Sequence, residues 1–463
     1  MKRKTFYFTI IIFIFIFFNT FAESFNSENI YNTIKILSSD KYRGRLAGDK
    51  GNYLAAQYIA NCFKKIGLDP LGDNGTFYQG FELIVPLLNG ECSFKVLDTN
   101  GNIVKKYEYG KDFKELIYGA SVSGEIIGKI KLMDKPGTIA IVEKGYSENS
   151  YQYNEDLMLK KSGIKAVIYP TNMDFRFRSP YKLQKLYNDG LIKIMVSKNL
   201  INEIIRYSSL GYNFEIKSPV QIKKVTVQNV IGMIKGKDES LPPVILSAHF
   251  DHVGFDADNI IYPGAFDNAS GTALLIEFAR ILKSLKDNKR TIIFAAFNGE
   301  EEGLLGSKYF VEHCPIDIKG AQCINFDMVG SKDKIPLSIL SLENSNRFVL
   351  DIYKIISPLS KVEIIYNDNS DHASFCKIGV DSVTLIHDNI SKIHTPKDTI
   401  ENVDIDRIKE VYDVAEAFLK SKDVIMVSAQ SNNQYFLYRK VIIILGAIIL
   451  SLSFILYFKR RNL

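Results

Sequence analysis

Carboxylate and imidazole side chains occur in an ordered series between residues 249 and 394. Each stands where an apolar, strand-like run gives way to a loop, and the members are His249, Asp267, Glu300, Glu301, Asp327 and His394. Carboxylate oxygens combined with imidazole nitrogens form a donor set that suits zinc. Four carboxylates and two imidazoles are enough for a pair of ions. The series therefore predicts a hydrolytic centre with two zinc ions.

The distribution of histidine supports this prediction. All six histidines lie between residues 249 and 394, and the rest of the chain has none. Histidines with only core or surface roles would be expected elsewhere as well. Their clustering, together with the carboxylates, favours a shared metal site.

Individual positions indicate roles at this centre. His249 and Asp251 form a His-x-Asp triplet, and a zinc-bound imidazole usually donates its second N–H to a carboxylate. We therefore expect Asp251 to orient His249. Asp267 precedes a helix and could be an ordinary N-cap, but its two oxygens and its loop-edge position predict a bridge between the ions. Asp327 is predicted to be a terminal ligand.

Glu300 and Glu301 follow the apolar run Thr291–Phe297. A solvated acidic run is the simpler interpretation. Adjacent glutamates can also divide two tasks, because one can bind metal while the other takes a proton from a metal-bound water, whose pKa falls to about 7. For the second imidazole, spacing alone leaves both His387 and His394 open.

The elements that carry these residues alternate between strand and helix, which predicts an α/β fold. Its catalytic domain would have a mainly parallel, mixed sheet covered by helices on both faces. The carboxyl ends of such strands form the ligand-binding edge. The predicted strands are Val244–Ala248, Thr291–Phe297, Ala321–Phe326 and Val383–His387, and the predicted helices are Tyr53–Gly67, Ala269–Lys286 and Asp404–Lys420.

A segment without histidine or a compact carboxylate cluster interrupts this pattern. Its short β-rich runs predict an inserted β-rich α/β accessory domain. The full division is a signal peptide (1–22), the N-terminal part of the catalytic domain (23–108), the insert (109–224), the main catalytic domain (225–425), a stalk (426–440), a transmembrane helix (441–458) and a cytoplasmic tail (459–463).

The two ends of the chain predict export and membrane anchoring. A basic start, an apolar run and Thr20-Phe21-Ala22 are typical of a signal peptide, although an uncleaved anchor is the alternative. Val441–Phe458 has no charge and as a helix spans about 27 Å, close to the hydrocarbon core of a bilayer. The basic residues after it would stay in the cytoplasm. We expect a single-pass protein with its catalytic domain on the extracytoplasmic side.

The formal charge of +6 does not indicate a nucleic-acid partner. Eight of the 58 basic residues lie in the two terminal segments, which leaves 50 basic against 52 acidic residues in the body. Nucleic-acid binding requires a concentrated basic face, and the sequence has none. The five scattered cysteines form neither a disulfide framework nor a Cys-x-x-Cys zinc motif.

The same residues carry a resemblance to the co-catalytic di-zinc aminopeptidase family, which also includes glutamate carboxypeptidase and the catalytically inactive transferrin receptor. Six ordered motifs over about 150 residues match, and similarity extends roughly from residue 28 to 421, with the insert resembling a protease-associated domain. The motifs are Ala248–Gly254, Gly264–Gly271, Gly299–Ser307, Asn325–Gly330, Ser370-Asp371-His372 and His394–Thr399.

The resemblance implies a complete ligand set. His249 and Asp327 would bind one zinc, Glu301 and His394 the other, and Asp267 would bridge them. Glu300 would be the general base. The family's last ligand precedes a Thr-x-x-Asp-Thr pattern, which favours His394 over His387.

One departure from the family pattern concerns the side chain that contacts the oxyanion. Some family members have a tyrosine directly before the last histidine, where this chain has Ile393. His372 is the candidate substitute for contact with the oxyanion or the substrate.

These expectations describe an exported, membrane-anchored di-zinc aminopeptidase that hydrolyses N-terminal residues from peptides through a metal-bridging hydroxide. A carboxypeptidase of the same family is the first alternative, although no arginine cluster adjoins the motifs. A glutaminyl cyclase fits less well, because all five metal-ligand positions are filled. A catalytically inactive receptor or binding module is the alternative from a different class.

Overall fold

The computed structural model describes residues 23–133, 135–142, 151–286, 288–422 and 424–425. No helix in these ranges is both long and apolar enough to cross a bilayer. The predicted signal peptide (1–22), stalk (426–440), membrane span (441–458) and tail (459–463) lie outside the described residues.

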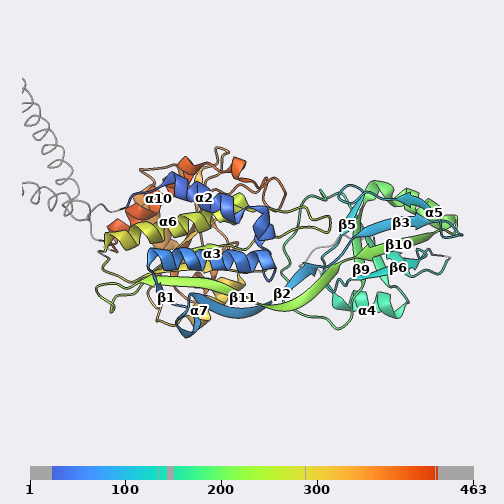
Figure 1. Cartoon of the computed structure of the whole chain (residues 1–463), viewed down its shortest axis with the longest axis horizontal. Coiled ribbons are helices and arrows are strands. Elements are labelled where there is room, and N and C mark those ends of the chain that lie inside the picture. Colours follow the sequence, from blue (N-terminus) through green and yellow to red (C-terminus); the bar gives the residue numbers. More distant parts are fainter. Residues whose placement is uncertain (1–22, 134, 143–150, 287, 423, 426–463) are drawn as a thin grey trace, which may run out of the picture.

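A nine-stranded sheet forms the centre of the larger body (Figure 1). Its order is β1-β11-β13-β12-β14-β17-β15-β16, and β2 pairs with β11. The strands are β1 (Asp69–Pro70), β2 (Tyr78–Leu88), β11 (Val220–Ile234), β12 (Val244–His249), β13 (Ile292–Phe297), β14 (Gln322–Phe326), β15 (Leu337–Ser341), β16 (Val362–Tyr366) and β17 (Asp381–Ile386).

The sheet is mixed rather than mainly parallel. Its middle strands β13, β12, β14 and β17 run parallel to one another. Antiparallel neighbours flank them, because β11 pairs with β13 on one side and β15 with β17 on the other. The sheet is therefore mixed, as predicted, but the antiparallel pairs make up more of it than a mainly parallel sheet would have.

Helices cover both faces of this sheet, as predicted. Alternate residues of β13 point to opposite cores. Phe294 belongs to the core that also contains residues of α2, α3, α6, α8 and α10, and Phe297 belongs to the core with residues of α7 and α9. The helices are α2 (Ser27–Leu37), α3 (Lys50–Ile66), α6 (Ser270–Leu285), α7 (Leu305–His313), α8 (Asn346–Ile356), α9 (His372–Lys377) and α10 (Ile405–Ser421).

The smaller body contains two four-stranded sheets, β4-β3-β10-β6 and β5-β9-β8-β7 (Figure 1). It is joined to the larger body by the long antiparallel pair of β2 and β11. Its elements are β3 (Ser93–Leu97), β4 (Ile103–Lys106), β5 (Phe113–Glu115), β6 (Gly124–Gly128), β7 (Ile139–Ile141), α4 (Tyr153–Lys161), β8 (Ala166–Thr171), β9 (Ile192–Ser197), α5 (Ile201–Ser209) and β10 (Asn213–Ser218).

The smaller body begins before residue 109, where the insert was predicted to start. Strands β3 and β4 lie before that residue, yet β3 pairs with β10 along its whole length. Segment 93–106 therefore packs with the smaller body. Its partner strand lies more than a hundred residues further along the chain, so no local pattern reveals the pairing.

Candidate metal centre

Three neighbouring parallel strands bring the predicted ligands to one edge of the large sheet. β12 ends at His249, β13 leads into Glu301, and β14 is followed directly by Asp327. Because the carboxyl ends of parallel strands meet at the same edge, these side chains converge. Asp267 approaches the same edge from the turn Ala265–Ala269 that precedes α6.

The first donor group consists of His249, Asp267 and Asp327. Nε2 of His249 lies 3.2 Å from Oδ1 of Asp327 and 3.4 Å from Oδ1 of Asp267. All three side chains are buried. The donor atoms of the three residues lie within 4.8 Å of one another. Buried carboxylates this close together are stabilised by a cation between them, so the donor set fits a metal ion.

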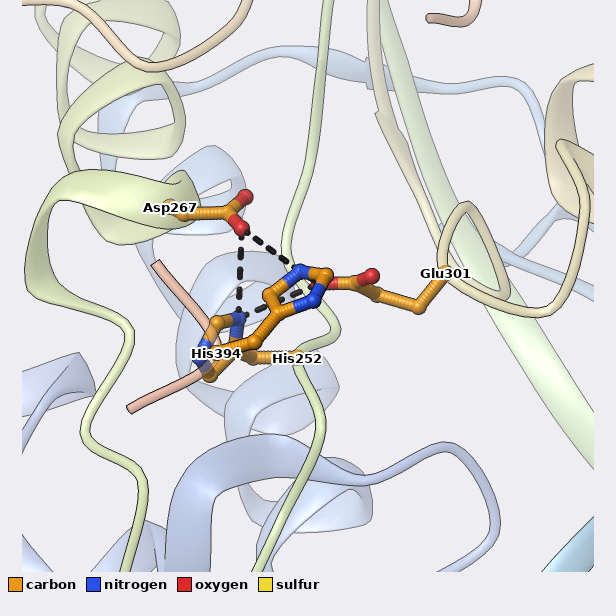
Figure 2. Close-up of side chains that lie close together, drawn as sticks. All are labelled: His252, Asp267, Glu301 and His394. Carbon is orange, nitrogen blue, oxygen red and sulfur yellow. Dashed lines mark hydrogen bonds and ion pairs between the residues drawn. The ribbon is translucent and has the colours of Figure 1, made fainter. Parts of the chain in front are cut away.

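The second donor group consists of His252, Asp267, Glu301 and His394 (Figure 2). Nε2 of His394 lies 3.2 Å from Oδ2 of Asp267 and 3.1 Å from Oε1 of Glu301. Asp267 is common to both groups and directs one oxygen to each, which is the arrangement expected of a bridging ligand. The structure thus brings all five predicted ligands together.

His252 was not predicted as a ligand. Its Nδ1 lies 3.1 Å from Oε1 of Glu301 and 3.6 Å from Oδ2 of Asp267. It lies three residues beyond His249, in a segment without regular secondary structure. The clustering of the histidines was a signal for it, but no spacing rule sets the direction of a side chain beyond a strand end.

Polar contacts hold the carboxylate ligands in place. The carboxylate of Asp398 accepts hydrogen bonds from the backbone N–H groups of Phe266 and Asp267, at 2.8 and 3.1 Å. The hydroxyl of Ser370 donates to Oδ2 of Asp327 at 2.7 Å. The two motifs that contain Asp398 and Ser370 therefore hold Asp267 and Asp327 in place.

Asp251 lies next to His249, as predicted, but the contact is long. Its Oδ1 is 3.7 Å from Nδ1 of His249, and neither atom has a hydrogen-bond partner among the described residues. The other oxygen, Oδ2, accepts the backbone N–H of Glu301 at 3.1 Å. Asp251 thus contacts residues of both donor groups.

Burial and charge both act on the imidazoles of the site. Burial alone would lower the pKa of His249, but Asp327 and Glu300 raise it well above its ordinary value. Burial alone would also lower the pKa of His394, but the carboxylates of Glu301 and Asp267 raise it well above its ordinary value. The surrounding carboxylates therefore favour positive charge at both imidazoles.

Glu300 adjoins the first donor group without belonging to it. Burial, together with the carboxylates of Glu301 and Asp327, raises its pKa well above the ordinary value, although His249 opposes the shift. A neighbouring carboxyl that sequence reasoning left without a role, Asp371, is fully buried, and burial raises its pKa to about 7.

Arg45 supplies a buried positive charge behind the site. Its guanidinium donates to backbone carbonyls that frame the loops carrying His249 and Asp267, namely those of Leu37, Phe250, Pro263 and Gly264. Burial lowers its pKa to about 10, while Asp398 and Asp267 oppose the shift. The group is therefore charged at neutral pH.

His372 does not serve the predicted oxyanion role. Its ring is buried, its Nε2–H donates to the carbonyl of Asn367 at 2.9 Å, and its Nδ1 accepts from the hydroxyl of Thr384 at 2.8 Å. Burial lowers its pKa to about 4, so the ring is neutral at pH 7. No N–H remains for a substrate oxygen, and the prediction for His372 was wrong.

His387 stands apart from both donor groups. Its Nδ1 accepts the backbone N–H of Gly330 at 3.0 Å, and its Nε2 lies 3.9 Å from a carboxylate oxygen of Glu410. These contacts explain why His394, and not His387, faces Asp267 and Glu301.

The chain is similar to known peptidases along most of its length. Residues 229–419, which include both donor groups, match the model of peptidase family M28. The aminopeptidase YwaD of Bacillus subtilis is 26% identical over 427 residues, which cover 85% of this chain and 84% of that protein.

Solved structures agree with this match. An aminopeptidase from Aneurinibacillus sp. strain AM-1 superimposes with a TM-score of 0.62 at 25% identity and covers 85% of this chain and 93% of its own. BSAP, a zinc aminopeptidase from Bacillus subtilis, shares the fold with a TM-score of 0.61 at 23% identity, over 88% of this chain and 97% of its own. On this evidence the chain is a zinc metallopeptidase, and its residues 229–419 match peptidase family M28.

Proposed function

We propose that the protein is an exported, membrane-anchored di-zinc aminopeptidase that removes residues from the N-termini of peptides. The observation that carries the proposal is the pair of donor groups joined through Asp267, which directs Oδ1 toward His249 and Oδ2 toward His394. A carboxylate between two such groups is suited to bridging two ions.

The residue roles follow from this geometry. His249 and Asp327 would hold one zinc, Glu301 and His394 the other, and Asp267 both. When bound, the ions would polarise the scissile carbonyl and acidify water. Glu300 would take a proton from the attacking water and deliver it to the leaving amine, a role that suits a carboxylate with a raised pKa.

Recognition of a free N-terminus is consistent with the charge of the site. Besides the three carboxylate ligands, the site has carboxyl groups at Asp251, Glu300 and Asp371. Carboxyl groups accept hydrogen bonds from a protonated α-amine whether or not all of them are ionised, so they suit such an amine better than a terminal carboxylate. These groups therefore support an aminopeptidase over the carboxypeptidase alternative.

The variant Glu300→Gln tests the catalytic part of the proposal. We expect hydrolysis of aminoacyl-nitroanilides to fall by about 10²- to 10⁴-fold, with the zinc content unchanged. Glu312→Gln, at an exposed position in α7, is the matched control. Wild-type rates in the Glu300 variant would refute the assignment.

Substrate pairs with free and blocked N-termini test whether the enzyme requires a free N-terminus. We expect peptides with a free amine to be cleaved at least about 100-fold faster than their N-acetylated forms, since an unpaired polar group in a binding site is costly. Equal cleavage of both forms would instead favour the carboxypeptidase alternative.

The location of the protein is proposed from its terminal segments. N-terminal sequencing of the protein from an expressing host is expected to begin at Glu23, and carbonate extraction is expected to leave the full chain in the membrane fraction. A soluble full chain would contradict the anchor. An intact Met1 would mean that the first 22 residues are retained.

A further inference from the structure

His252 has the surroundings of a metal ligand, although the five ligands of the proposed function do not include it. Its side chain is fully buried, and its Nδ1 faces the same two carboxylate oxygens that His394 faces. Its Nε2 has no hydrogen-bond partner among the described residues. The simpler interpretation is that His252 only donates a hydrogen bond to Glu301.

The four nitrogen–oxygen distances within the second donor group are of the length expected between donors of one zinc ion, and all its donor atoms lie within 4.8 Å of one another. With metal–ligand bonds of about 2.0 Å, neighbouring donor atoms of a tetrahedral zinc site lie about 3.3 Å apart. The separations of the His252 and His394 nitrogens from Oδ2 of Asp267 and Oε1 of Glu301 are 3.6, 3.1, 3.2 and 3.1 Å (Figure 2). Two imidazoles and two carboxylates therefore surround a space of the right size.

The first donor group differs in the number of its ligands. His249, Asp267 and Asp327 provide three donor atoms, with separations of 3.2 and 3.4 Å from Nε2 of His249. Zinc sites with four protein ligands are closed, whereas catalytic sites retain an open position.

We propose that His252 is a fourth protein ligand, which closes the site of Asp267, Glu301 and His394 and makes the two zinc ions unequal. This inference rests on the proposed di-zinc function. The closed site retains its ion more tightly, and the open site of His249, Asp267 and Asp327 exchanges its ion and admits water and substrate.

X-ray absorption at the zinc edge counts the imidazole ligands of the bound zinc ion directly. The full chain is stripped of metal and given one equivalent of zinc, which is expected to occupy the closed site. Two imidazoles per zinc would support the inference. A single imidazole per zinc would overturn it, even if the protein binds two ions and hydrolyses peptides.

Chelator titration of the zinc-loaded chain provides the second measurement. Wild type is expected to lose its two ions in two steps, separated by at least a tenfold difference in chelator concentration. His252→Asn places an amide N–H near the position of Nδ1, so it can still donate to Glu301 but is a poor zinc ligand. We expect this variant to lose its tighter zinc at a chelator concentration at least tenfold lower than wild type.

The controls separate the possible failures. His313→Asn, at an exposed histidine of α7, should behave as wild type. If His252→Asn retains zinc as tightly as wild type, His252 is only a hydrogen-bond donor and the inference is overturned. If wild type itself binds no zinc, the proposed function fails as well.

Discussion

The backbone N–H of Arg178 donates a hydrogen bond of 2.9 Å to the carbonyl oxygen of His394. Arg178 lies between β8 and β9 of the smaller body, and His394 belongs to the metal centre of the larger one. The neighbouring ring of Phe177 lies 5.8 Å from the imidazole of His394, centroid to centroid. The insert therefore forms a wall of the candidate site.

Replacement of Phe177 by alanine tests whether this wall contacts the substrate. The ring is half-buried, and loss of its apolar contact would weaken binding by about 1.4 kcal/mol. We expect KM for aminoacyl substrates to rise about tenfold, with kcat and zinc content nearly unchanged. Leu186→Ala, at an exposed position of the same connection, is the control. An unchanged KM for every substrate tested would exclude the contact.

Ser370 is predicted to strengthen zinc binding through Asp327. Because its hydroxyl donates to Oδ2 of that ligand at 2.7 Å, Ser370→Ala removes a contact that orients the carboxylate. Loss of such supporting contacts lowers metal affinity by about 10- to 100-fold. Competition with a chromophoric chelator measures the change. Ser391→Ala, at an exposed loop position, should have no effect, and an equal effect of both variants would contradict the role.

Arg45 is predicted to stabilise the fold as well as the site. Arg45→Met leaves three buried carbonyls and one partly buried carbonyl without their donor, so we expect the free energy of unfolding in urea to fall by about 3–5 kcal/mol. The neighbouring Arg43 is partly exposed and pairs with Asp49 at 3.0 Å. Arg43→Met is therefore expected to cost less than about 1 kcal/mol. Similar losses in both variants would contradict the role of Arg45.

The features predicted correctly from the sequence are those with local signals. Strands β12, β13 and β14 are largely apolar runs, and their ends lie within two residues of the predicted positions. His249, Glu301 and Asp327 lie at or shortly after the ends of these runs, so one rule about strand ends brings them together. Asp267 was predicted from its position at a loop edge before a helix, and the choice of His394 over His387 rested on the resemblance.

The features that were missed depend on contacts between distant segments. His252 and His372 are both buried histidines within motifs, but one faces Asp267 and Glu301 while the other contacts Thr384 and Asn367. The sequence contains no local signal that separates the two cases. The pairing of β3 with β10 likewise joins segments far apart in the chain.

Removal of zinc is predicted to make stability depend on pH. In the metal-free protein the pKa values of His249 and His394 are raised, so the folded state binds their protons more tightly than the unfolded chain. This stabilisation is complete below about pH 6.5 and is lost as the pH rises through the raised pKa values. Between pH 7 and 9.5 we expect the Tm of the metal-free protein to fall by at least about 3 °C.

Zinc binding should abolish this dependence of Tm on pH, because zinc displaces the protons from both imidazoles. The zinc-loaded protein is expected to keep its Tm over the same range, and its zinc affinity should weaken as the pH falls below 7. Scanning calorimetry with and without chelator, at a series of pH values, measures both effects. Parallel pH profiles for the two forms would mean that His249 and His394 bind no protons that zinc displaces, and they would count against these imidazoles as ligands.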